Sequence, residues 1–136
     1  MEPKVTQGLQ ALGFFKDWTN YLLVTTVAAL GWIATKPVVG FPSWLLALTI
    51  ACFGLSIVFA ILTLALIPIV GEKYESKTTS IYDVDAPFKT FWLWGKTRHS
   101  RLKVPCWPQH VFFLAGIILF CVGSIIGVIT SAPVPV

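Results

Sequence analysis

The sequence predicts an all-α membrane protein with three transmembrane helices, an antiparallel hairpin followed by a third span after a long cytoplasmic interfacial loop. Hydrophobic residues make up 56% of the 136 residues and charged residues only 12%, about half the usual charged share of a globular domain. Three apolar runs without ionisable residues are each long enough to cross a hydrocarbon core of about 30 Å. A soluble chain of this size needs more polar surface than this composition supplies.

The first two spans are expected at residues 18–35 and 43–70, joined by the short outer turn 36–42. A turn of this length places consecutive helices side by side and antiparallel. The second run is longer than a bilayer requires, so we expect it either to tilt or to end near Pro68, whose ring removes a helix hydrogen bond.

The N-terminal segment, residues 1–17, precedes the first span. Val5, Leu9 and Leu12 fall on one helical face, with Phe15 near its edge, which predicts a short amphipathic helix on the membrane surface. The apolar run that follows is long for a signal peptide and its N-terminal flank has mixed charge, so we expect a retained span.

The loop 71–110 separates the second span from the third, residues 111–130, and an outer Pro-rich tail occupies residues 131–136. Nine of the ten Lys and Arg residues lie in the N-terminal segment or this loop, and one lies in the short turn. The positive-inside rule therefore predicts a cytoplasmic N-terminus and loop, with the C-terminus on the outer side.

Aromatic and basic residues gather at the expected interface. Cationic side chains gain about 1 kcal/mol each near an anionic leaflet, and indole rings settle at the headgroup level. We therefore predict anionic headgroups as ligands of this belt, which also offers a docking site for a cytoplasmic protein partner. Nucleic acid is disfavoured because no recognisable module accompanies the basic cluster. The belt comprises Trp18, Trp44, Trp92, Trp94, Trp107, Lys89, Lys96, Arg98, Arg101 and Lys103.

No residue set points to catalysis, a metal or a cofactor. Cys106 and His110 stand four apart, but Pro105 and Pro108 are expected to break any helix that would align them. The three cysteines include no CxxC pair, which disfavours a disulfide framework. A nucleophile with a base, paired catalytic carboxylates and a phosphate-binding loop are all missing from the sequence. We therefore expect a protein that is not an enzyme and holds no cofactor.

Small residues form stripes along the spans, and such stripes allow helices to approach closely. The stripe of the third span is Gly116, Gly123, Gly127 and Thr130. One face of the second span carries Thr49, Cys52, Ser56, Ala60 and Thr63, and its opposite face carries Ala47, Ala51, Gly54 and Ala65. Two small faces on one helix exceed what a single neighbour requires, which favours contact with another integral membrane protein.

The sequence therefore favours a non-catalytic subunit that scaffolds or stabilises a larger, hetero-oligomeric membrane complex. Two alternatives stay open. One is a small homo-oligomeric channel or permeabilising protein, with the hydroxyl-bearing face of the second span lining the pore. The other is a membrane-tethered binder of anionic lipid or of a cytoplasmic partner, acting through residues 88–107.

Overall fold

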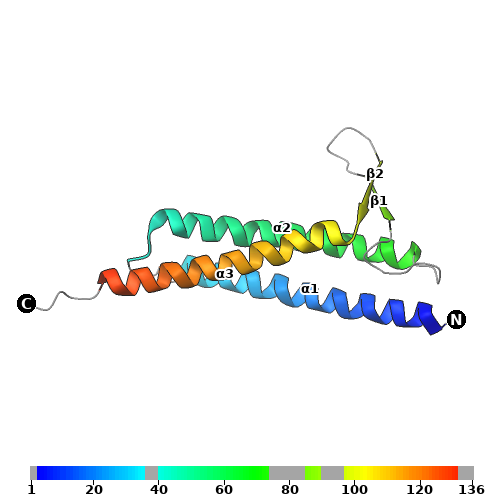
Figure 1. The fold of residues 1–136 in the computed structure, drawn as a ribbon, viewed down its shortest axis with the longest axis horizontal. Coiled ribbons are helices and arrows are strands. Elements are labelled where there is room, and N and C mark those ends of the chain that lie inside the picture. The colour runs from blue at the N-terminus through cyan, green and yellow to red at the C-terminus, as the bar shows by residue number, and fades with distance from the viewer. Residues whose placement is uncertain (1–2, 36–39, 74–84, 90–96, 132–136) are drawn as a thin grey trace, which may run out of the picture.

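Three long helices and one short β-hairpin make up the fold. The structure, a computed structural model, describes residues 3–35, 40–73, 85–89 and 97–131. The helices are α1 (Pro3–Thr35), α2 (Ser43–Lys73) and α3 (Lys103–Ser131). The start of α1, the end of α2, the hairpin and the start of α3 lie at one end of the molecule, and Ser131 lies at the other (Figure 1). The predicted three-helix architecture is confirmed.

The hairpin was not predicted. Strands β1 (Asp85–Lys89) and β2 (Thr97–Arg101) pair antiparallel, with Asp85 opposite Arg101 and Lys89 opposite Thr97. These strands lie inside the segment that the sequence assigned to an irregular loop. The hairpin leads directly into α3, so it fixes the place where the chain re-enters the helical bundle.

Two helices, α2 and α3, are long and apolar enough to cross a membrane, over Ser43–Glu72 and Lys103–Ser131. The expected first span does not pass the same test. Its polar residues, such as Asn20 and Tyr21, lower the hydropathy of α1. Two of the three described helices thus have the length and composition of membrane-spanning helices.

The structure joins the N-terminal segment and the expected first span in one continuous helix. Within α1, Leu12 and Phe15 are buried and belong to an apolar cluster with residues of α2 and α3. The physical reason is that α2 continues through Pro68 to Lys73, which provides an apolar partner for this face. Leu9 remains 36% exposed.

The helix α3 begins at Lys103, eight residues before the expected span, and this corrects the expectation that its prolines break the helix. Pro105 lies in the first turn, where backbone N–H groups have no intrahelical partner and proline is tolerated. Pro108 costs one further hydrogen bond but does not end the helix. Cys106 and His110 are consequently aligned one turn apart.

A seven-residue spacing marks the buried face of each helix. This period indicates coiled-coil-like packing, because an apolar or small seam every 3.5 residues keeps facing its neighbour. The buried positions are Leu12, Thr19, Thr26 and Ile33 in α1, Thr49, Ser56, Thr63 and Val70 in α2, and Leu102, immediately before α3, with Gln109, Gly116 and Gly123 in α3. Six of these twelve residues carry polar side chains, so the interior is unusually rich in hydroxyl groups.

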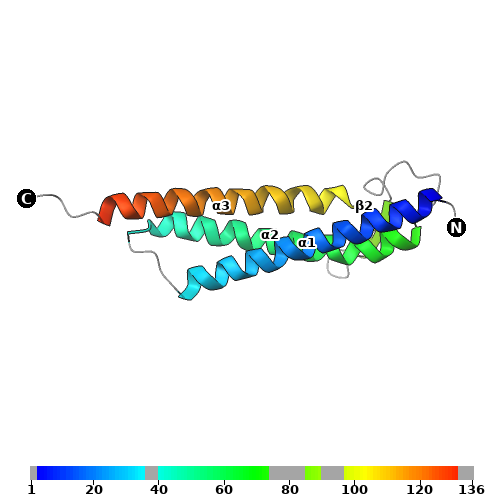
Figure 2. The same ribbon diagram turned by 90° about the horizontal axis from the view of Figure 1, so that it is seen from below.

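The helices α2 and α3 run side by side along their length, whereas the C-terminal end of α1 diverges from α3 (Figure 2). Aromatic rings fill the α2–α3 seam. Phe59 and Phe112 stack with ring centroids 5.8 Å apart, and Phe53 and Phe113 are tilted with centroids 6.4 Å apart. The interface between these two helices is therefore the principal packing surface of the fold.

Candidate partner-binding and membrane-interface surfaces

Two glycines of α3 pack against aromatic rings, Gly116 against Phe53 of α2 and Gly123 against Phe41, which lies just before α2. A Cβ atom placed on Gly116 would lie 2.7 Å from two ring carbons of Phe53, and one placed on Gly123 would overlap the ring of Phe41. Close approach at these positions therefore requires glycine. The predicted stripe of α3 is used inside the chain at Gly116, Gly123 and Gly127, which are buried, whereas Thr130 is exposed.

The hydroxyl-bearing face of α2 also packs inside the chain. Thr49, Ser56 and Thr63 are at most 1% exposed. Thr49 and Thr63 donate to carbonyl oxygens of their own helix, each at 2.8 Å, whereas Ser56 donates across to the backbone oxygen of Gln109 at 3.1 Å. Cys52 and Ala60 on the same face are buried as well. This face meets α1 and α3 in a single copy of the chain.

The opposite face of α2 is open. Ala47, Ala51 and Ala65 are exposed, Gly54 is half-buried, and a Cβ atom added to Gly54 would meet nothing within 4 Å. Val58 lies on the same face and is 52% exposed. We call this surface, residues 47, 51, 54, 58 and 65, the outer face of α2. It is apolar, and most of it is not covered by the described part of the chain.

A side-chain hydrogen bond between Trp18 and His110 links α1 to α3. The Nε1–H group of Trp18 donates to Nε2 of His110 at 3.1 Å, and Nδ1 of His110 lies 2.8 Å from the carbonyl oxygen of Cys106. Because Nε2 accepts, the neutral imidazole carries its proton on Nδ1 and donates it to that carbonyl. Both ring nitrogens of His110 are thereby engaged.

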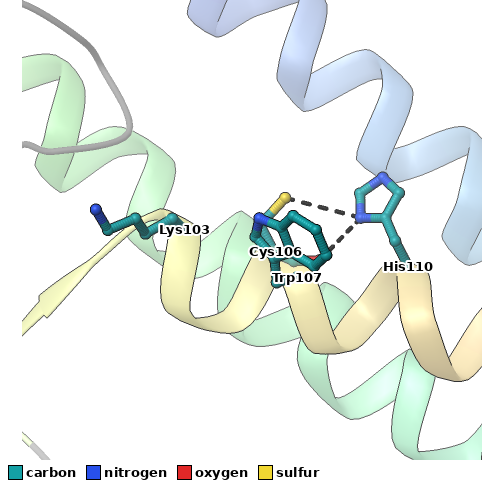
Figure 3. Close-up of a pocket in the computed structure, with 4 residues that line it drawn as sticks. All are labelled: Lys103, Cys106, Trp107 and His110. Atoms are coloured by element: carbon teal, nitrogen blue, oxygen red, sulfur yellow. Dashed lines mark hydrogen bonds between the residues drawn. The ribbon is translucent and has the colours of Figure 1, made fainter.

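A pocket of about 440 Å³ opens beside this contact, lined by Lys103, Cys106, Trp107 and His110 (Figure 3). The Cys106 sulfur points towards His110 and lies 3.7 Å from Nδ1. Within the described residues, no group of three His, Cys, Asp or Glu side chains is placed to hold a metal ion. The lining of the pocket is mainly apolar.

The residues of the predicted interface belt are only partly described. Trp18, Trp44 and Trp107 are 49%, 67% and 72% exposed, and Arg101 and Lys103 are exposed near the hairpin. Lys89 and Arg98 lie on the paired strands, and Trp92, Trp94 and Lys96 lie outside the described residues. Trp107, Arg101 and Lys103 thus lie at the hairpin end of the bundle, Trp18 lies near the middle of α1, and Trp44 lies at the start of α2, near the other end.

Three buried polar residues were missed by sequence reasoning. Thr19, Thr26 and Gln109 are at most 1% exposed. The signal was present, because Leu12, Thr19, Thr26 and Ile33 repeat every seven residues, and so do Leu102, Gln109, Gly116 and Gly123. Comparison of the chain with known protein families, with characterised proteins and with solved structures finds no match.

Proposed function

We propose that this protein is a non-catalytic membrane subunit that stabilises a larger membrane protein complex. The observation that carries the proposal is that one face of α2 is buried within the chain and the opposite face is not. Its hydroxyl-bearing face is buried by contacts within the chain, whereas most of its outer face is exposed: Ala47, Ala51, Val58 and Ala65 are exposed and Gly54 is half-buried. Small residues let a second helix approach closely where apolar burial gives no driving force. The outer face therefore suits a transmembrane helix of another protein.

In the proposed topology α1 is a third span, and the hairpin end faces the cytoplasm. The start of α1, the hairpin and the start of α3 lie at the same end of the bundle (Figure 1), in agreement with the distribution of Lys and Arg residues. Arg101 and Lys103 are then at headgroup depth, where cationic side chains interact favourably with anionic lipids.

The pore alternative is less favoured. It requires Thr49, Ser56 and Thr63 to line water in a multimer, yet these side chains are covered within one copy. A pore lined by this face would need the chain to give up its own α1 and α3 contacts. No comparable cost attaches to docking on the outer face of α2.

The test of the subunit proposal is purification of the native particle in mild detergent, with every component identified. The variant Ala51→Leu places a larger side chain on the outer face, and Ala28→Leu is its matched control on the exposed side of α1. Overpacking of a close helix contact costs about 1–3 kcal/mol, so we expect about 5-fold to 150-fold weaker partner retention for Ala51→Leu. Ala28→Leu should retain the partner.

Two results would contradict the proposal in different ways. A particle that contains only copies of this chain would overturn the hetero-oligomeric assignment, and ion flux in liposomes would then test the pore. A partner that stays bound equally to both variants would show that the outer face of α2 is not the docking surface.

A further inference from the structure

The side chain of Gln109 is buried without a hydrogen bond. It is 0% exposed, and neither Oε1 nor Nε2 has a partner among the described residues. An amide group carries two N–H donors and one carbonyl acceptor. Buried groups of this kind are nearly always paired, either with protein or with an ordered water molecule. The position of Gln109 therefore calls for a ligand.

Gln109 belongs to a polar layer across the bundle. Leu12 of α1, Val70 of α2 and Leu102, the residue just before α3, share the apolar cluster near the hairpin. Moving one heptad into the bundle along each helix reaches Thr19, Thr63 and Gln109, all 0% exposed. Because the helices advance by the same rise per heptad, these three residues lie at a similar depth. We call them the polar layer.

The two hydroxyl groups of this layer can accept but have already used their protons. Thr19 donates to the carbonyl oxygen of Phe15 at 2.9 Å, and Thr63 donates to that of Phe59 at 2.8 Å. Each hydroxyl oxygen keeps acceptor capacity. Neither hydroxyl has a second proton for the Gln109 carbonyl, so the threonines cannot satisfy that acceptor without giving up their backbone bonds.

We propose that Gln109 binds internal water in the polar layer, between the three helices. A water molecule can accept from Nε2–H and donate to Oε1 or to a threonine oxygen, which supplies the donor that the protein lacks. Buried waters typically make two to four such bonds. The inference is independent of the proposed subunit function, because it concerns the interior of one chain.

Bound water in this layer has a structural consequence. A polar residue at a core position of a helical bundle fixes the register, since a slip by one turn places it against apolar neighbours. Two turns from Thr63 along α2, the Ser56 hydroxyl donates to the backbone oxygen of Gln109 at 3.1 Å. The side chain and the backbone of Gln109 would thus both anchor α3 in its observed register.

The test is nuclear magnetic resonance of the full chain in deuterated detergent, with glutamine labelled by nitrogen-15. The protein has three glutamines, and replacing the exposed Gln7 and Gln10 by alanine leaves a single side-chain amide pair. We expect nuclear Overhauser cross-peaks between the Gln109 side-chain amide protons and water. Their sign should be that of a direct dipolar contact with a water molecule that stays bound for a long time. Gln109→Leu should abolish them and so confirm the assignment.

Two outcomes would overturn the proposal. Amide cross-peaks to protein protons only, with none to water, would mean that the Gln109 amide binds no long-lived water. The water cross-peak could instead disappear in Thr19→Val or in Thr63→Val while the rest of the spectrum is retained. The signal would then come from the hydroxyl proton of that threonine, which exchanges with water, and not from bound water. Persistence of the cross-peak in both single variants is the result that bound water predicts.

Discussion

Replacing Gly116 by alanine should destabilise the bundle, and the structure allows the size of the effect to be worked out. The added Cβ atom would lie 2.7 Å from two ring carbons of Phe53 and 3.1 Å from a third. Carbon atoms prefer separations of about 3.5–4.0 Å, so the ring must move by about 1 Å. Phe53 is only 2% exposed and packs against Phe113, so it has little room to move. Overpacking of this kind costs about 1–3 kcal/mol.

A second effect opposes this cost, because alanine is favoured over glycine in a helix by about 0.8–1.0 kcal/mol. Gly54→Ala provides the matched control, since nothing lies within 4 Å of its added Cβ atom. The propensity gain is common to both variants, so the difference between their free energies of unfolding isolates the clash. We expect Gly116→Ala to be about 1–3 kcal/mol less stable than Gly54→Ala.

The assay is reversible unfolding by sodium dodecyl sulfate in mixed micelles, followed by circular dichroism. The variant Phe53→Leu should reduce the penalty of Gly116→Ala, because contacting residues are energetically coupled. Equal stability of the two glycine variants, within about 0.5 kcal/mol, would refute the close contact between α2 and α3 at this position.

Two further predictions concern the interhelical hydrogen bond and the topology. Ser56→Ala removes the bond to the backbone oxygen of Gln109 and should lower the free energy of unfolding by about 0.5–1.5 kcal/mol, whereas Ser124→Ala, which breaks a bond within α3, should change it less in the same unfolding assay. With the three native cysteines replaced by alanine, Thr35→Cys should react with an impermeant maleimide from outside intact cells, and Glu72→Cys only after permeabilisation. Labelling of both from the same side would contradict the proposed spans.

The sequence predicted the helices well and their ends poorly. Long apolar runs identify α2 and α3 because lipid-compatible segments have few alternatives to helix. The first turns of α3 contain Lys103, Pro105 and Pro108, which no apolar criterion includes. The hairpin ends at Arg101, so the helix can begin at Lys103, and Pro105 in its first turn loses no hydrogen bond. Pro108 costs one hydrogen bond without ending the helix.

The sequence of the hairpin residues gives little indication that they form β-strands. Its second strand, Thr97–Arg101, is short and rich in basic residues, without the alternation that marks a strand with one buried face. The pairing of β1 with β2 is a contact between segments separated in the chain. Local composition does not encode such a contact.

The sequence shows the small-residue stripes but not which neighbour covers each of them. Periodicity shows which residues share a face, because 3.6 residues complete one turn. It does not show which neighbour covers that face. The structure supplies this information for Gly116 and Gly123, which receive the rings of Phe53 and Phe41. Substitutions at these two glycines therefore test the fold of the chain, whereas substitutions on the outer face of α2 test its assembly.

The chemistry of the two faces of α2 is consistent with this separation. A membrane subunit must be stable in lipid before it binds its partner. An unpaired polar group exposed to hydrocarbon costs several kcal/mol. Ser56, whose hydroxyl bond crosses to α3, lies on the face that is always covered within the chain. Ala47, Ala51 and Ala65 on the outer face carry no polar side-chain atom. Under the proposed function, that face would be exposed to lipid without burying an unpaired polar side chain and would still allow close approach of a partner helix.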